Sequence, residues 1–266
     1  MPLPNYEVYA IKYAERTNVK RADNFVGGDP HDGPMPMDYY LWLIRDQQRL
    51  VVVDTGFDAE VAAKRKRTFV REPRAALAAL GVKAEDVREI IITHMHNDHV
   101  GTFFHFPNAI LHIQDEEMAY ATGRYMANPT FRRPYEIDHV VDVVRMVFTD
   151  SVVFHKGDEE LAPGLHLHHI GGHTAGLQAV RVHTQRGWMV LASDAAHYYE
   201  NIENKRCFPT VFNLGQMVDG YEKLNRLADS PRHIIPGHDP LVLKRYPPVS
   251  PDLAGAIARL DVEPLE

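Results

Sequence analysis

Three histidines and an aspartate crowd into residues 93–99, which read Thr93-His94-Met95-His96-Asn97-Asp98-His99. The apolar run of residues 90–92 precedes them, as expected for a strand that ends in a tight loop. Side chains alternate along extended chain, so His94 and His96 should point the same way, with Asp98 and His99 on the loop beyond. Imidazole nitrogens and carboxylate oxygens are ligands of zinc and similar metals, and one structural ion needs four ligands. Four candidates here, with others elsewhere, suggest two ions.

Three further candidate ligands also follow apolar segments of the chain. His173 comes after a predicted strand and two glycines, Asp194 ends the run of residues 190–193, and His238 follows residues 234–237. Strand ends are rigid places from which side chains can be aimed at one point. A lone histidine at any of these positions would more often be structural, but their joint occurrence with the first cluster favours a shared metal site.

The composition narrows the class of protein. The 266 residues fit one large domain or two small ones, and 45% hydrophobic with 24% charged residues is typical of a globular protein. A net charge of −7 argues against a nucleic-acid partner, and no apolar run approaches the ~20 residues that span a bilayer. Cys207 is the only cysteine, which excludes an internal disulfide and a cysteine-rich zinc site. With no signal-peptide pattern at the start, a cytoplasmic location is expected.

The hydrophobic pattern predicts strands alternating with helices. Strands are expected at residues 7–14, 39–44, 50–53, 89–92, 109–113, 152–155, 164–170, 178–183, 188–192 and 233–235. Helices are expected at residues 59–63, 74–80, 116–120, 136–147, 214–227 and 252–260. The basic run at residues 64–67 reads as a solvated helix end, because a nucleic-acid patch is improbable in an acidic protein.

Two segments outside this pattern are candidates for the surroundings of a site. Residues 115–148 form a helix, loop and helix between strands, and we interpret them as a pocket-forming insertion in a single domain spanning residues 1–266. Residues 24–37 are rich in glycine and proline, and this loop could pack across a homodimer. Side chains that could line the pocket, although core packing is their commoner fate, are Phe103, Phe104, Phe106, Met126 and Phe131.

The candidate ligands carry a family resemblance. Their order and rough spacing resemble the ligand series of the metallo-β-lactamase superfamily, from Asp54-Thr55-Gly56 to Gly237-His238. The resemblance implies an α+β fold, an αββα sandwich of two mixed sheets flanked by helices, with the site at one edge between the sheets. The ligand series that it implies gives one zinc to His94, His96 and His173 and the other to Asp98, His99 and His238, with Asp194 bridging both.

The resemblance is closest to the N-acyl homoserine lactone lactonases, the quorum-quenching branch. The chain length, the insertion, and the segments Ser193-Asp194-Ala195-Ala196 and Ile235-Pro236-Gly237-His238-Asp239 carry it. It implies a dinuclear-metal hydrolase that opens a lactone ring by attack of a hydroxide shared between the metals. Asp98 could carry the proton to the leaving group. Asp54 could orient a histidine ligand, or could simply form an Asp-Thr-Gly turn.

One departure from that branch falls beside the bridging aspartate. Its members typically have a tyrosine three residues after this aspartate, where it hydrogen-bonds the lactone carbonyl. This chain has His197 there, followed by Tyr198. Either His197 takes over as donor, or a change of register brings Tyr198 to the substrate.

Several alternatives stay open at this point. The same fold could hydrolyse a different lactone, a small ester or a thioester, or could serve as a metal-binding sensor without turnover. Zinc is expected because of its geometry and availability, but cobalt, manganese and iron accept the same ligands.

Overall fold

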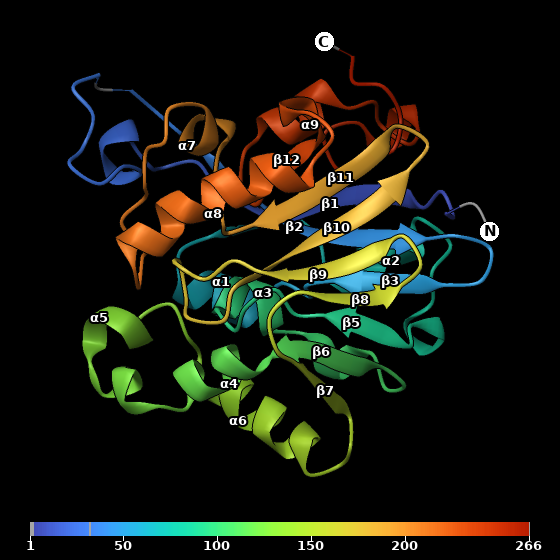
Figure 1. The fold of residues 1–266 in the computed structure, drawn as a ribbon, viewed down its shortest axis with the longest axis horizontal. Helices are drawn as coiled ribbons and strands as arrows, with labels where there is room; N and C mark the ends of the chain where they lie inside the picture. Colours follow the sequence, from blue (N-terminus) through green and yellow to red (C-terminus); the bar gives the residue numbers. More distant parts are fainter. Residues whose placement is uncertain (1–2, 32, 266) are drawn as a thin grey trace.

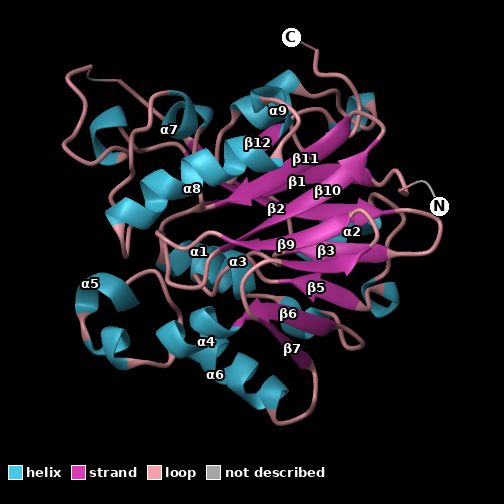
Figure 2. Ribbon diagram, viewed as in Figure 1, coloured by secondary structure: helices cyan, strands magenta, loops and turns pink. Residues whose placement is uncertain are grey.

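A computed structural model describes residues 3–31 and 33–265 of the chain. Its strands form two mixed sheets that lie face to face, with helices on their outer faces (Figure 1, Figure 2). The strand order in the first sheet is β13-β1-β2-β3-β5-β6-β7, with β4 paired to β1, and in the second it is β12-β11-β10-β9-β8. This arrangement confirms the αββα sandwich that the resemblance implies.

The first sheet begins with antiparallel pairs and becomes parallel from β3 through β7. Its strands are β1 (Glu7–Arg16), β2 (Met37–Arg45), β3 (Leu50–Val53), β4 (Thr68–Phe69), β5 (Glu89–Ile91), β6 (Ile110–Gln114), β7 (Val152–His155) and β13 (Ile257–Arg259). In the second sheet only β11 and β12 run parallel. Its strands are β8 (Glu159–Ala162), β9 (Leu165–His169), β10 (Gln178–Thr184), β11 (Gly187–Ser193) and β12 (Ile234–Pro236).

The helices connect these strands and cover the outer faces of the sheets. They are α1 (Ala59–Lys64), α2 (Pro73–Ala78), α3 (Asn97–Val100), α4 (Asp115–Ala121), α5 (Pro129–Arg132), α6 (Ile137–Val147), α7 (Tyr199–Glu203), α8 (Leu214–Leu227) and α9 (Leu241–Arg245). Asp58 caps α1, because its side chain accepts from the Val61 amide. In the described part of the chain, none of the helices is long and apolar enough to cross a membrane.

The core has three layers, because each strand alternates its side chains between two faces. In β1, Ile11 packs outward against the helices beside the first sheet, whereas Ala10 packs inward between the sheets. In β11, Leu191 joins the layer between the sheets, whereas Val190 packs outward with residues of α8. The fully buried Trp42 lies in the middle layer. Burial on both faces is what makes these strands read as nearly continuous apolar runs.

Residues 115–148 lie between β6 and β7, where they form α4, α5 and α6 at one end of the molecule (Figure 1). The described part of the loop at residues 24–37 contacts its own chain, where Asp29 accepts from the Arg206 guanidinium at 2.6 Å and the Asn24 amide donates to the Tyr198 hydroxyl at 3.0 Å. Both segments lie beside the edge of the sandwich that carries the candidate ligands.

The helix predicted at residues 252–260 is wrong. Residues 257–259 form β13, which extends the first sheet by pairing with β1, and Tyr9 lies opposite Arg259. Gly255 adopts a φ of +73°, which an α-helix cannot accommodate. Pairing with a sheet edge therefore overrides the local helical pattern.

Candidate metal centre

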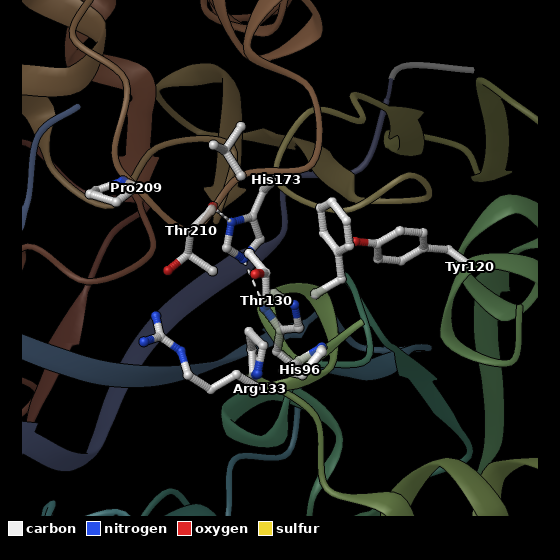
Figure 3. Close-up of a pocket in the computed structure, with 11 residues that line it drawn as sticks. His96, Tyr120, Thr130, Arg133, His173, Pro209 and Thr210 are labelled. Atoms are coloured by element: carbon white, nitrogen blue, oxygen red, sulfur yellow. Dashed lines mark hydrogen bonds between the residues drawn. The ribbon is translucent and has the colours of Figure 1, made fainter. Parts of the chain in front are cut away.

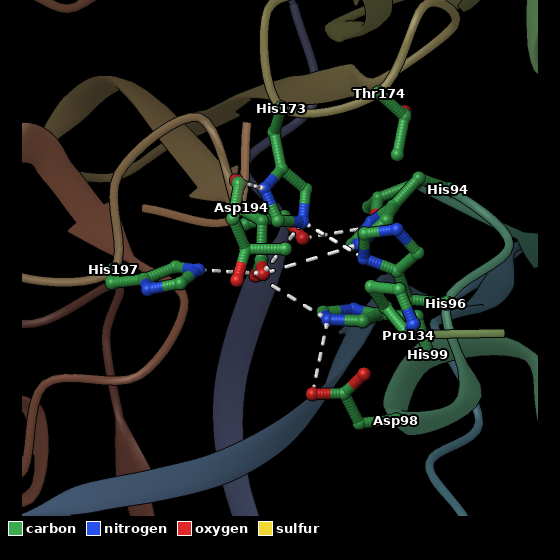
Figure 4. A network of polar contacts seen from close by, with 12 residues as sticks. His94, His96, Asp98, His99, Pro134, His173, Thr174, Asp194 and His197 are labelled. Atoms are coloured by element: carbon green, nitrogen blue, oxygen red, sulfur yellow. Dashed lines mark hydrogen bonds and ion pairs between the residues drawn. The ribbon is translucent and has the colours of Figure 1, made fainter. Parts of the chain in front are cut away.

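The predicted ligands follow the ends of strands from both sheets and meet at one edge of the sandwich. His94 and His96 follow β5, and Asp98 and His99 lie in the short helix α3. The remaining ligands lie beyond β9, β11 and β12, and they are His173, Asp194 and His238. The structure brings all seven together, and Figure 4 labels all of them except His238. We call these seven residues the ligand cluster.

One set of nitrogens in the ligand cluster comes from three buried imidazoles. His94 Nε2 lies 3.0 Å from His96 Nδ1, and His173 Nε2 lies 2.9 Å from the same atom. Zinc binds histidine nitrogens at about 2.0–2.1 Å in tetrahedral geometry, which places ligand atoms roughly 3.3 Å apart. The three nitrogens therefore have nearly the spacing that a shared ion would impose.

A second set combines two imidazoles with a carboxylate. Asp98 Oδ2 lies 3.9 Å from His99 Nε2 and 3.9 Å from His238 Nε2. The two histidines are buried, whereas the Asp98 side chain is 17% exposed and faces a cavity. This set is therefore more open than the first.

The carboxylate of Asp194 lies between the two sets. Its Oδ1 is 3.3 Å from His99 Nε2 and 3.0 Å from His238 Nε2. Its Oδ2 is 3.3 Å from His173 Nε2 and 4.0 Å from His94 Nε2. One oxygen thus faces each set, which is the geometry needed to serve two ions at once.

Two polar atoms of the ligand cluster form no hydrogen bond of suitable geometry with the described residues, although each lies within 3.3 Å of another atom of the cluster. They are His99 Nε2 and Asp194 Oδ1, both inaccessible to solvent. A buried polar atom without a partner is costly, so such atoms in a cluster of imidazole and carboxylate groups call for an ion. The donor set consists of nitrogen and oxygen atoms only, and it fits zinc or a similar divalent metal.

Hydrogen bonds on the outer nitrogens fix the orientation of three imidazoles. His99 Nδ1 donates to Asp54 Oδ2 at 2.7 Å. His173 Nδ1 donates to the Thr210 carbonyl at 2.6 Å, and His238 Nδ1 donates to the Asp38 carbonyl at 2.8 Å. Each bond leaves the corresponding Nε2 free to face the ligand cluster.

Asp54 both orients a histidine and shapes a turn, so the two readings of this residue are compatible. Besides the His99 bond, its carboxylate accepts the Thr93 amide and the Thr93 hydroxyl, each at 2.8 Å. Its backbone has a φ of +58°, and Ser193, at the end of β11, has a φ of +46°. The Thr93 and Ser193 hydroxyls are 2.8 Å apart, so Thr93 links these two unusual strand ends. Each such conformation costs about 1–3 kcal/mol and persists only where surrounding contacts enforce it.

Glu117 is a structural residue of the site that sequence reasoning missed. It is fully buried in α4, where its carboxylate accepts from the Met95 amide at 2.8 Å and the Thr174 hydroxyl at 2.6 Å. It thereby joins the two loops that carry His96 and His173. The contact is close: a Cβ at Gly176 would lie 2.0 Å from the Glu117 amide nitrogen. A glutamate within an acidic first helical turn gave no signal of this role.

The two sets of imidazoles differ in their electrostatics. Burial, together with neighbouring imidazoles, holds the pKa of His94 and His96 well below the ordinary value, and burial lowers the pKa of His173 to about 4. Burial acts on His99 and His238 too, but nearby carboxylates outweigh it, chiefly that of Asp194, and raise the pKa of both. Burial therefore favours neutral imidazoles in the first set, whereas the carboxylates favour protonated imidazoles in the second set, where a binding metal would have to displace protons.

His197 lies beside the ligand cluster, whereas Tyr198 points away from it. His197 Nε2 is 2.9 Å from Asp194 Oδ2, and its ring stacks on Phe208 with 3.6 Å between centroids. The Tyr198 hydroxyl is held by the Asn24 amide at 3.0 Å and donates to the Met35 carbonyl at 3.2 Å. Tyr198 is 2% exposed and does not line the cavity over the ligand cluster. The geometry therefore gives no support to the change of register considered for Tyr198.

Two adjoining cavities lie over the ligand cluster. The larger, of about 690 Å³, includes Asp98, Asp194 and His197 in its lining. The smaller, of about 330 Å³, shares His96 and His173 with it and extends along α5 (Figure 3).

The insertion contributes to the smaller cavity, but with fewer aromatic residues than predicted. Phe131 lines it together with Tyr120. Phe103 and Phe106 instead pack in the core, and Phe104 is exposed. Met126 lines a different cavity, which shares Arg133 with the smaller one.

Comparisons with known proteins agree with this architecture. Residues 36–238 match the model of the metallo-beta-lactamase superfamily. A probable metallo-hydrolase of Mycobacterium tuberculosis is 26% identical over 227 residues, which is 77% of this chain and 72% of the relative. The N-acyl homoserine lactonase AiiB of Agrobacterium fabrum is 33% identical over 132 residues, which is 47% of this chain and 46% of the relative.

Solved structures share the fold at low sequence identity. A quorum-quenching N-acyl homoserine lactone lactonase superposes with a TM-score of 0.75 at 21% identity, covering 90% of this chain and 94% of that one. AidC, a dizinc quorum-quenching lactonase in complex with a product, superposes with a TM-score of 0.71 at 17% identity, covering 90% of each chain. With the family model spanning most of the sequence and both sheets in place, the chain belongs to the metallo-beta-lactamase superfamily.

Proposed function

We propose that this protein is a metal-dependent hydrolase that opens lactone rings. The observation that carries the proposal is the orientation of the Asp194 carboxylate, which directs one oxygen toward each set of imidazoles. The names of the relatives, a metallo-hydrolase and several lactonases, support the same reaction class.

We assign His94, His96 and His173 to one divalent ion, and Asp98, His99 and His238 to the other, with Asp194 shared. Zinc suits this donor set best. Two such ions, when bound, would supply hydroxide near neutral pH and polarise the carbonyl of an ester. The protein's own part is to hold the imidazoles rigidly, through Asp54 and the carbonyls of Thr210 and Asp38.

Asp98 is placed to move a proton. Its side chain is the partly exposed carboxylate of the ligand cluster, and it lines the cavity where a substrate would lie. When the lactone ring opens, the ring oxygen leaves as an alkoxide and needs a proton. We assign Asp98 to carry this proton, because a carboxylate within reach of the leaving oxygen can act as a general acid and base.

We assign His197 to positioning rather than to hydrogen-bond donation toward the substrate carbonyl. Burial lowers the pKa of His197, so the ring is neutral near pH 7. Its Nε2 faces the Asp194 carboxylate at 2.9 Å and must carry the proton there. Nδ1 is then an acceptor only. His197 therefore holds Asp194 in place, and the tyrosine-like role considered for this position does not suit its tautomer.

N-acyl homoserine lactones are the first substrates to test, because several relatives and structural neighbours are lactonases of this class. We would follow proton release in weak buffer over a panel of acyl homoserine lactones, simple γ- and δ-lactones, an aryl ester, a thioester and a β-lactam. Turnover of lactones well above the other classes is expected. Turnover of the thioester or β-lactam alone would overturn lactone opening. Full metal binding without any turnover would favour a sensor.

A further inference from the structure

Three arginines line the larger cavity over the ligand cluster and have no carboxylate partner among the described residues. Arg16 lies at the end of β1, Arg67 immediately before β4, and Arg133 immediately after α5. We call these three residues the arginine wall. They gather beside the site although the chain as a whole carries a net charge of −7.

The fold forces two of these arginines together. β1 and β4 are antiparallel, with Ala14 opposite Phe69 and Glu15 opposite Thr68. The next pair in this register is Arg16 and Arg67. Like charges directly opposite each other on neighbouring strands destabilise a sheet. A bound anion between the two arginines would offset this repulsion.

The side-chain contacts of these arginines leave their charges unmatched. Arg16 Nε is buried and has no hydrogen-bond partner among the residues described. Arg67 donates to the Arg65 carbonyl at 2.9 Å, and its guanidinium lies 5.8 Å from the centre of the Tyr39 ring. No described residue forms an ion pair or hydrogen bond with the Arg133 guanidinium. In Figure 3 its side chain extends to the side away from His96, and its guanidinium group lies below Thr210 in this view.

Arg65, the fourth arginine that lines this cavity, is paired with a carboxylate. Arg65 Nε donates to Glu136 at 2.8 Å, and Arg65 Nη2 donates to the Tyr135 carbonyl at 2.9 Å. Similar pairs occur elsewhere in the chain, as between Arg49 and Glu89 at 2.6 Å. The arginine wall differs from these pairs because three guanidinium groups without a carboxylate partner among the described residues line one cavity.

The carboxylates of the cavity do not neutralise the arginine wall. Those lining it are Asp23, Asp98 and Asp194. Asp98 and Asp194 face the imidazoles of the ligand cluster, and Asp23 accepts the Lys20 amide at 3.1 Å. The wall is therefore free to receive an anion that enters the cavity from outside.

We propose that the preferred substrate carries an anionic group, a carboxylate or a phosphate, which the arginine wall binds while its ring lies over the ligand cluster. A guanidinium presents a planar fork of donors that matches both groups. The inference rests on the proposed lactone-opening function and narrows its substrate class. Neutral acyl lactones would leave the three guanidinium groups unmatched, so they should be poorer substrates.

The first test compares matched lactones. The neutral γ-butyrolactone is paired with its 5-carboxylate, and a neutral δ-lactone with a δ-lactone that bears a phosphate ester. Among these and decanoyl homoserine lactone, kcat/KM should be highest for an anionic member, and the winning pair identifies carboxylate or phosphate. A neutral lactone as the best substrate would overturn the inference and leave the hydrolase proposal standing.

The second test removes the arginines one at a time. In Arg16→Gln, Arg67→Gln and Arg133→Gln, kcat/KM for the anionic lactone should fall about 10- to 100-fold, mainly through KM, because the bound anion loses one of its guanidinium partners. The neutral lactone should change little, and each Arg→Lys variant should recover part of the loss. Arg226→Gln, at an exposed position of α8, is the control. Equal losses on neutral and anionic lactones would contradict the proposal.

Direct binding separates this inference from the proposed function. Calorimetry would measure the affinity of the holoenzyme for 2-hydroxyglutarate, the ring-opened form of the carboxylated γ-lactone, and for 4-hydroxybutyrate, which lacks the second carboxylate. Tighter binding of 2-hydroxyglutarate, lost in the three Gln variants, supports the arginine wall even if no lactone is hydrolysed. Equal affinity for the two compounds would overturn it even if lactones are hydrolysed.

Discussion

The ligand cluster and the arginine wall face the same cavity but are built in opposite ways. In the ligand cluster, a hydrogen bond donated by Nδ1 fixes the orientation of the imidazoles of His99, His173 and His238, whose Nε2 atoms face Asp194. The guanidinium groups of Arg16 and Arg133 have no such partner among the residues described. The residues of the ligand cluster follow the ends of strands in both sheets. The residues of the arginine wall lie at the end of one strand and in the segments that follow α1 and α5.

This difference indicates that the ligand cluster and the arginine wall have separate roles. A preorganised cluster sets the reaction, because its geometry does not depend on which substrate enters. An unmatched wall sets the preference, because its charges are satisfied only by the right substrate. Changes in the cluster should therefore affect all substrates equally, and changes in the wall should affect substrates selectively.

The strongest test of the cluster is Asp194→Asn. Losing the shared carboxylate should lower metal content and reduce kcat/KM for every hydrolysed substrate by about 10³-fold or more, because the low pKa of metal-activated water is lost. Elemental analysis and initial rates would measure both effects. Asp261→Asn replaces an equally buried aspartate that pairs with Arg259 and does not line the cavity, and it should keep both metal and activity. A selective effect of Asp194→Asn on one substrate would break the comparison.

Asp54→Asn should produce a smaller loss that is again uniform across substrates. Its amide nitrogen would face the His99 Nδ1–H, so the orientation of that imidazole should loosen, with a cost of about 10- to 100-fold in metal affinity or activity. Metal titration and rates on two substrates would measure it. Asp58→Asn, at the cap of α1, should leave both unchanged because asparagine caps as well as aspartate. An unaltered metal affinity in Asp54→Asn would contradict the orienting role.

Phe131→Ala tests the apolar part of the cavity lining. Removing this ring should raise KM for lactones with an apolar tail by roughly tenfold and leave kcat nearly unchanged, because about 1–2 kcal/mol of apolar contact is lost. Steady-state kinetics on short- and long-chain lactones would measure the difference. Phe104→Ala, at an exposed position, should have no effect. A fall in kcat with unchanged KM would indicate that Phe131 affects the catalytic step instead of substrate binding.

The smallest effect near neutral pH is expected outside the cavity, at His112. Burial, together with His155, lowers its pKa from 6.5 to about 4, so the folded protein favours the neutral ring. Its stabilising contribution is complete above pH 6.5 and is lost as the pH falls toward 4, up to about 3 kcal/mol. Urea unfolding at pH 7.5, 5.5 and 4.5 should show a flatter pH dependence in His112→Gln.

The exposed His31 supplies the matched control for that measurement. His31→Gln should keep the pH dependence of the unmodified protein. If His112→Gln also keeps it, another group causes the acid sensitivity. The measurement sharpens the main comparison, because it separates loss of the fold at low pH from titration within the cavity.

The ligand cluster could be anticipated from sequence because its signals are local. His94, His96 and Asp98 fall within one short stretch of sequence, and His173, Asp194 and His238 each follow an apolar strand. In a two-sheet fold such strand ends converge, so the residue pattern and the resulting geometry agree.

The surroundings of the cluster could not be anticipated, because their meaning is set by contacts between distant segments. Glu117 matters because α4 packs between two loops, and Arg16 and Arg67 because β4 pairs with β1. The role of Tyr198 depends on the loop that carries Asn24, whose amide holds its hydroxyl. None of these contacts leaves a spacing or motif in the sequence.

The most direct test of the account is a metal titration of the metal-free protein. Calorimetry with Zn²⁺, repeated with Co²⁺ to read the coordination spectrum, counts the ions that the ligand cluster binds. About two ions per chain are expected to bind, with protons released mainly on binding to the set that contains His99 and His238. Saturation at one ion per chain, or no tight binding, would contradict it.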